Sequence, residues 1–184
     1  QMDLFFDSAP ILAAQELTIA IVDRRGNDIP NLLARLKLLA PETYPSFEHL
    51  LAHQEQLCHC SSTKSKIECL LDTMSPLAFS ILGRFAGDYL TPIWQQLSLE
   101  LSGRPFDAES PQDHLSFTAI KSFDWREVLV AIEAEEGWYR QPVLLYRHAE
   151  ACFKLNREAE GLASWFRLYM LFPKSAQQLV NGTD

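Results

Sequence analysis

Apolar residues in this sequence recur at helical spacing, in segments closed by Gly, Pro or small polar residues. Phe47, Leu50, Leu51 and Leu57, for example, fall near one face if the chain turns by about 100° per residue. The pattern predicts an all-α fold of about ten helices, with a short tail helix at the end. The expected ranges are 9–25, 29–40, 46–59, 65–74, 76–88, 92–102, 111–122, 125–136, 142–155 and 158–172, with the tail helix around 174–181.

One segment, residues 17–22, also fits a buried strand because it is rich in β-branched side chains. We favour a helix there, since Ser8 and Pro10 provide a start signal and Arg24-Arg25-Gly26 an end signal. No other segment offers a convincing partner strand, and a lone strand leaves its backbone groups unpaired.

Proline following Ser or Thr is the commonest start signal, because proline is tolerated in the first helical turn and the hydroxyl can cap free N–H groups. This pairing predicts helix starts at Ser75-Pro76, Thr91-Pro92 and Ser110-Pro111. Capping-box spacing is found from Asp124 to Glu127 and from Ser65 to Glu68. Residues expected to close helices in a left-handed conformation are Gly26, Gly103, Gly137 and Asn156.

Three helix pairs begin at Pro76, Pro111 and Pro142, roughly one 34-residue repeat unit apart. The last pair, residues 142–173, resembles a tetratricopeptide repeat. The residues that carry the resemblance are Ala149 and Gly161 at the small positions, Cys152-Phe153 at the apolar slot, Asn156 in the turn, Trp165 at the large aromatic position and Pro173 at the close. His148 and Leu168 depart from the residues that this family favours.

The resemblance implies that the first helix of the pair lines a concave, peptide-binding face. The matching positions are Val143, Tyr146, Glu150, Phe153 and Lys154. Tyr146 and Glu150 lie one turn apart, so they could present an aromatic ring beside a carboxylate. The alternative is that Val143 and Phe153 belong to the core and that Glu150 is solvated.

We expect one all-helical domain over residues 1–184, as stacked antiparallel helix pairs in a tetratricopeptide-like α-solenoid or an irregular bundle. Residues 1–74 could form an N-terminal helical subdomain, followed by a repeat-like region at 76–184.

The charge composition indicates which classes of partner the chain does not bind. The chain has 24 acidic and 16 basic residues, a formal charge of −8, which repels phosphate backbones and anionic membranes, so we expect neither nucleic-acid nor membrane binding. No apolar stretch approaches the roughly 20 residues needed to span a bilayer. Acidic residues near Met2, the expected native start, argue against a secretory signal. The cysteines then suit a cytoplasmic protein with reduced thiols.

Histidines and cysteines between residues 49 and 69 give the clearest alternative, a metal-binding or thiol-sensing regulator. His49, His53 and Cys60 fall on one helical stripe, and imidazole and thiolate are the ligands that zinc prefers. However, Cys58-His59-Cys60 lacks zinc-knuckle spacing, and no second ligand pair follows at zinc-finger distance. Surface histidines and buried cysteines are the simpler interpretation, with no metal.

Catalytic patterns are weaker still. His148 and Cys152 are one helical turn apart, but nothing nearby supplies an oxyanion site. The acidic run 133–136 could attract a cation or basic partner, although such runs are usually solvated. We therefore expect a non-catalytic protein–protein interaction module or assembly subunit without a cofactor. An enzyme whose residues converge only in three dimensions stays an alternative.

Overall fold

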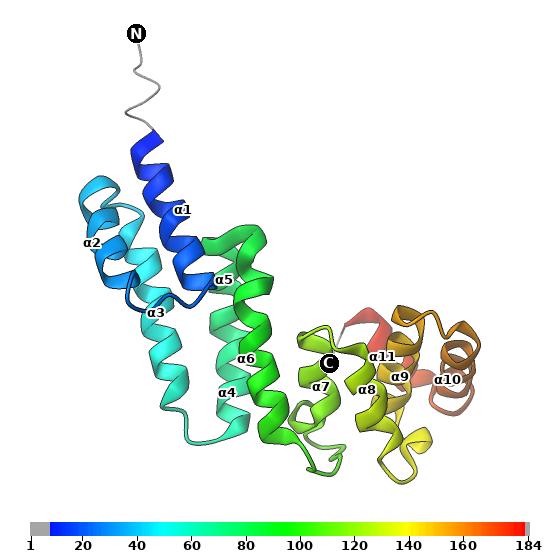
Figure 1. Ribbon diagram of the computed structural model, residues 1–184. Helices are drawn as coiled ribbons and strands as arrows, with labels where there is room; N and C mark the ends of the chain where they lie inside the picture. The colour runs from blue at the N-terminus through cyan, green and yellow to red at the C-terminus, as the bar shows by residue number, and fades with distance from the viewer. Residues whose placement is uncertain (1–7, 183–184) are drawn as a thin grey trace. The chain divides into compact units, whose positions relative to one another are not determined.

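The computed structural model describes residues 8–182, and the expected start at Met2 lies outside them. Within this range every regular element is helical and no strand occurs (Figure 1). The all-α prediction with about ten helices is confirmed, and the segment 17–22 is part of a helix. None of the helices in the described range is long and apolar enough to cross a membrane.

The chain divides into two compact units, residues 1–92 and 93–184, whereas the sequence placed a subdomain boundary at 74–76. The N-terminal unit holds α1 (Ser8–Val22), α2 (Ile29–Leu39), α3 (Tyr44–Cys58), α4 (Thr63–Cys69) and α5 (Ser75–Leu82), and the start of α6 (Ala86–Leu101). Its core is formed by fully buried side chains, among them Leu17, Leu36, Leu50, Leu70 and Met74.

Helix α5 begins at Ser75, as the Ser75-Pro76 pairing predicted, but the break expected before it is wrong. A π-helical turn, Leu70–Met74, joins α4 to α5, and the Ser75 N–H bonds to the Leu70 carbonyl oxygen. Pro76 has no N–H and follows this wide turn without ending the helical path. The cap of α4 also lies three residues earlier than expected, because the hydroxyl of Ser62 accepts from the Ser65 N–H at 3.1 Å.

The predicted start at Thr91-Pro92 is also wrong, since both residues lie inside α6. The helix instead follows Gly83, whose φ of 54° lies in the left-handed region, and a 3-10 turn, Gly83–Phe85. Thr91 caps nothing, because its hydroxyl donates back to the Gly87 carbonyl at 2.8 Å. Thr91-Pro92 gives the same local signal as a first-turn proline although Pro92 lies inside α6, so the sequence alone does not distinguish the two positions.

The C-terminal unit contains the end of α6, followed by two helix pairs and a final helix. The pairs are α7 (Leu115–Lys121) with α8 (Trp125–Glu133) and α9 (Pro142–Lys154) with α10 (Glu158–Leu171), and the last helix is α11 (Pro173–Asn181). Packed helix pairs are compatible with a helical-repeat fold. One core cluster joins Ala119, Val128 and Leu144, and a second joins Leu145, Leu168 and Leu179.

Local signals in this unit were mostly interpreted correctly. Asp124 caps α8 by accepting from the Glu127 N–H at 3.1 Å. Gly103, Gly137 and Asn156 have positive φ as expected. Two expectations fail: in the N-terminal unit Arg24 rather than Gly26 has positive φ, and in the C-terminal unit His114 rather than Ser110 caps α7.

Candidate protein-binding surfaces

The pair α9–α10 is built around a close approach of two small positions. Ala149 is fully buried, and Gly161 lies under the ring of Phe153, where a Cβ on residue 161 would come 2.9 Å from Phe153 Cε1. Pro173 begins α11 instead of merely ending the pair. The helices therefore pack through the residues that the sequence singled out for close packing.

All five residues predicted to bind a partner lie on the least buried side of α9. Val143, Tyr146 and Glu150 are half-buried, whereas Phe153 and Lys154 are exposed. The Tyr146 hydroxyl donates to the Glu150 carboxylate at 3.2 Å. The structure thus brings the predicted ring and carboxylate together.

Most of these residues also contact neighbouring parts of the same unit. Val143 and Tyr146 pack against the cluster that α9 and α10 share with α11. The Phe153 ring covers Gly161, and the Lys154 ammonium lies 5.8 Å from the centre of the Trp125 ring. Because packing accounts for these contacts, a binding role for this face of α9 stays a prediction.

A buried polar network lies inside the pair, centred on His148. Its Nδ1 lies 2.9 Å from the Ser164 hydroxyl and 3.5 Å from the Cys152 sulfur, and its Nε2 lies 3.4 Å from a Glu133 oxygen. The imidazole stacks on Trp138 with ring centres 4.4 Å apart. Burial lowers the pKa of His148, partly offset by Glu133. Sequence reasoning singled out Glu133 as part of the acidic run 133–136 but not its contact with His148, and it found no signal for Ser164, because the three residues lie on different helices.

Ser164, His148 and Glu133 are in contact in that order, yet the first two are almost fully buried. The nearby cleft, about 380 Å³, is lined by Glu133 and includes neither His148 nor Ser164. Burial also raises the pKa of the Cys152 thiol, the opposite of what an activated nucleophile needs. We interpret the network as hydrogen bonding that satisfies buried polar groups and joins three helices.

A second buried network joins the start of α7 to the turn that follows α8. The Nδ1 of His114 accepts from the Ser116 N–H at 3.2 Å, so Nε2 carries the proton and faces Glu135 at 3.5 Å. Arg147 donates to the Ser116 hydroxyl and to the Pro111 carbonyl, each at 2.9 Å. In the acidic run 133–136, Glu133 and Glu135 therefore contact buried histidines.

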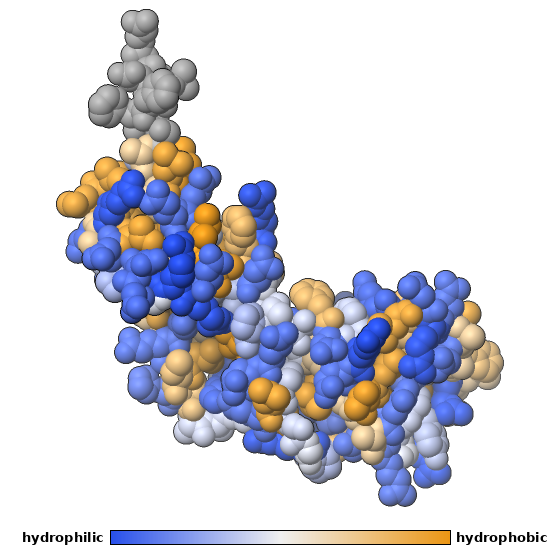
Figure 2. Space-filling view, in the orientation of Figure 1, coloured by the Kyte–Doolittle hydropathy of each residue, from blue (hydrophilic) through white to orange (hydrophobic). Residues whose placement is uncertain are grey.

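Helix α10 presents an uncharged face to solvent, which we call the α10 stripe. Three long side chains dominate it: Leu162 is 61% exposed, Phe166 68% and Met170 65%. Figure 2 shows hydrophobic surface over this helix and, in the other unit, over α1. The α10 stripe consists of Ala159, Leu162, Ala163, Phe166, Tyr169 and Met170, all exposed.

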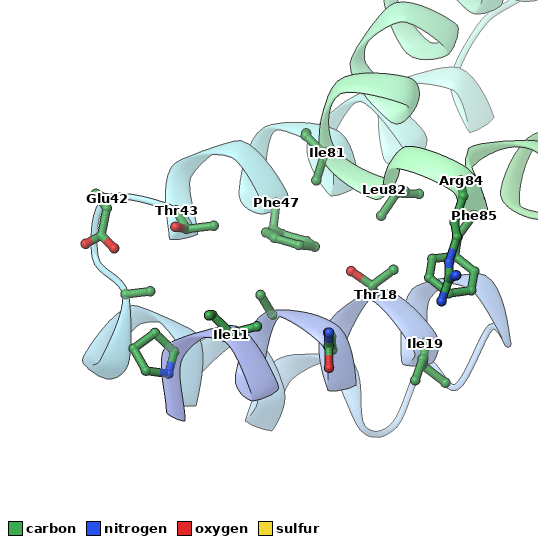
Figure 3. Close-up of a pocket in the computed structure, with 14 residues that line it drawn as sticks. Ile11, Thr18, Ile19, Glu42, Thr43, Phe47, Ile81, Leu82, Arg84 and Phe85 are labelled. Carbon is green, nitrogen blue, oxygen red and sulfur yellow. The ribbon is translucent and has the colours of Figure 1, made fainter. Parts of the chain in front are cut away.

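The N-terminal unit contains a groove of about 580 Å³, which we call the α1 groove (Figure 3). Its floor and walls are mainly apolar, and Phe47 lies between Ile11 of α1 and Ile81 of α5. Glu42 and Arg84 lie at opposite ends. The lining residues are Pro10, Ile11, Ala14, Gln15, Thr18, Ile19, Ala40, Glu42, Thr43, Phe47, Ile81, Leu82, Arg84 and Phe85.

Helix α1 explains why the groove is apolar. Between Pro10 and Val22 its one charged residue is Glu16, which pairs with Arg35 of α2 at 2.6 Å. Ile11 is 61% exposed and Ile19 45% exposed on the groove side. A helix that is apolar on every side is usually covered on every side, and the structure covers α1 only in part.

The proposed zinc ligands come together only in part. The Nε2 atoms of His49 and His53 lie 2.8 Å apart, while the Cys60 thiol donates to the Gln56 carbonyl. Within residues 8–182, no group of three or more His, Cys, Asp or Glu side chains is placed to hold a metal ion. Burial, followed by the nearby Cys60, raises the pKa of the Cys69 thiol.

Comparison with protein-family models, with curated proteins and with solved structures gave no match. The arguments for function therefore rest on the surfaces described above.

Proposed function

We propose that this chain is a non-catalytic protein-binding module, or a subunit of a larger assembly, and that it binds an amphipathic helix of a partner protein in the α1 groove. The observation that carries the proposal is the groove itself, with apolar walls between one acidic and one basic end. Grooves between helices commonly receive the apolar face of a partner helix. The proposal keeps the cytoplasmic location expected from the sequence.

The charges at the two ends define the partner more closely. Glu42 favours a basic side chain at one end of the bound helix, and Arg84 favours an acidic side chain at the other end. Between them the partner would present apolar side chains one helical turn apart toward Phe47 and Ile81. Opposite charges at the ends also fix the direction in which the helix lies.

We further propose that α9–α10 is a tetratricopeptide-type repeat and that the predicted face of α9 is a secondary contact surface. The close approach at Gly161 and the Tyr146–Glu150 pair support this proposal. The α1 groove is the stronger candidate for the main contact because its apolar side chains are left uncovered.

Photo-crosslinking in the native cell extract tests the main proposal. A photoreactive residue at position 11 lies in the groove, whereas one at position 12 lies on the same helix outside it, although Leu12 is also 49% exposed. We expect a discrete protein adduct from position 11 and none from position 12. Equal adducts from both positions, or none from position 11, would contradict the proposal.

A charge exchange tests the orientation. Synthetic amphipathic helices with a basic and an acidic end should bind the purified chain more weakly after Glu42→Arg or Arg84→Glu. The double variant should then prefer peptides with the two ends exchanged. A double variant that keeps the wild-type preference would show that these charges do not contact the partner.

A further inference from the structure

The α10 stripe is a second apolar surface, in the other unit, and does not depend on the α1 groove. At about 100° per residue, its six residues fall within about 120° of arc centred on Phe166. No charged residue falls in that arc, although it extends from Ala159 to Met170, over three turns of the helix. Contiguous apolar patches of this kind mark contact surfaces.

The opposite side of α10 packs against the other helices of the same unit. Gly161, Ser164 and Leu168 are buried there, and Leu168 belongs to the cluster shared with α9 and α11. The helix therefore has two apolar sides, and the unit covers one. In helical-repeat proteins the last repeat usually has a polar outer side, so the α10 stripe is suited to further packing.

The charges beside the stripe indicate what packs there. Glu158 lies at the N-terminal end of α10, and Lys174 lies just beyond its C-terminal end. Two copies in antiparallel order would place the acidic end of each helix beside the basic end of the other. Parallel order would bring like charges together.

The apolar residues have the same symmetry. Leu162 precedes Phe166 by four residues and Met170 follows it by four, so a two-fold axis at Phe166 would pair the leucine of each copy with the methionine of the other. The two Phe166 rings would meet at the axis. A surface that matches itself in this way is what a symmetric dimer requires.

We propose that this chain self-associates through the α10 stripe, as a symmetric dimer of antiparallel α10 helices. One face of a single helix is smaller than the roughly 800 Å² per partner of a standard interface. The dimer is therefore in equilibrium with the monomer, with a dissociation constant on the order of micromolar.

Sedimentation velocity of the purified full-length chain, from low to high micromolar concentration, tests the dimer. The mass should rise from 21.0 kDa toward twice that value, and Phe166→Glu should raise the dissociation constant at least tenfold. The matched control is Leu99→Glu in the same unit, since Leu99 is 72% exposed and lies outside the stripe. A wild-type chain that stays monomeric, or a dimer that Phe166→Glu leaves intact, overturns the proposal.

Charge exchange tests the antiparallel order. Glu158→Lys and Lys174→Glu should each weaken the dimer, and the double variant should recover most of the loss because each new lysine meets a new glutamate. Circular dichroism of each variant separates a lost interface from a lost fold. Additive weakening in the double variant would rule out the antiparallel arrangement.

Discussion

The ring of Phe153 occupies the space that a side chain at position 161 would need, because a Cβ there would come 2.9 Å from Cε1 and 3.1 Å from two other ring carbons. Glycine inside a helix costs about 1 kcal/mol relative to alanine. Gly161 is nevertheless fully within α10. The sequence tolerates that cost because α9 brings an aromatic ring directly against the α10 backbone.

The effect of Gly161→Ala should therefore depend on residue 153. In the wild-type background we expect a loss of about 1 kcal/mol, since the displaced ring outweighs the gain in helix propensity. In a Phe153→Ala background the same substitution should stabilise the protein by about 0.5–1 kcal/mol. Urea denaturation followed by tryptophan fluorescence reports this unit, because all four tryptophans lie in residues 93–184.

If Gly161→Ala has the same effect in both backgrounds, the ring and the glycine are not energetically coupled. Leu168→Ala is the destabilising control, since truncating a fully buried leucine should cost about 2–5 kcal/mol in the wild-type background and in the Phe153→Ala background alike.

The helices could be predicted from the sequence because their signals are local. Asp124 and Glu127 lie within one turn of each other, and the cap that they predict is present. Gly137 and Asn156 have the left-handed conformation expected of their residue types. The small positions at Ala149 and Gly161 also lie where the repeat pattern placed them, since close packing depends on residue size.

The features that the sequence did not reveal depend on contacts between distant residues or on alternatives of similar energy. Ser62 and Ser65 are both plausible caps by residue type, and the structure uses Ser62. The π-helical turn before Pro76 has no sequence signature. The uncovered side of α1 could not be found either, because the residues that form the opposite wall of the groove are far away along the chain.

Acid should destabilise the C-terminal unit through its buried histidines. Burial lowers the pKa of His148 and of His114 below that of free histidine. The unfolded chain then binds more protons than the folded chain below about pH 6.5. The contribution of the two neutral histidines to the free energy of unfolding is therefore fully present above that pH and falls as the pH decreases. Each histidine can contribute at most about 1.4 kcal/mol per pH unit.

The experiment is urea denaturation at pH 7.5, 6.5 and 5.5, with tryptophan fluorescence as the signal. Replacing His148 with Asn keeps a group that can hydrogen-bond to Ser164 but cannot gain a proton, so His148→Asn should flatten part of the decline. The variant His114→Asn/His148→Asn should flatten more of it. An unchanged pH profile in that double variant would mean that other groups cause the acid sensitivity.

Alkali should act on the N-terminal unit through Tyr89. Its side chain is almost fully buried, its hydroxyl donates to the Gln54 carbonyl oxygen at 2.9 Å, and burial raises its pKa from 10.0 to about 12. Because the pKa of Tyr89 is higher in the folded chain than in the unfolded chain, the contribution of its protonated hydroxyl to the free energy of unfolding is fully present below pH 10. That contribution is lost as the pH rises toward 12, by about 3 kcal/mol at most.

The variant Tyr89→Phe isolates this effect. We expect a loss of about 1 kcal/mol at neutral pH from the missing hydrogen bond, and a smaller further loss between pH 10 and 11.5 than the wild type shows. Thermal unfolding followed by circular dichroism measures both. Parallel losses in the two proteins over that pH range would assign the alkaline sensitivity to other groups.

Pro92 should lower the stability of α6, because it lies inside a helix that runs from Ala86 to Leu101. A proline there has no N–H to donate to the carbonyl one turn earlier and usually costs about 3 kcal/mol. Part of that cost is offset because proline also restricts the unfolded chain. We expect Pro92→Ala to stabilise the protein by about 2 kcal/mol.

The matched control is Pro142→Ala at the start of α9, where proline lies in the first turn and its removal should instead cost about 0.5 kcal/mol. Thermal and urea unfolding of the two variants should therefore shift in opposite directions. If Pro92→Ala is no more stable than the wild type, a backbone N–H at position 92 adds nothing to the stability of α6. Pro92 would then behave like a proline in the first turn of a helix.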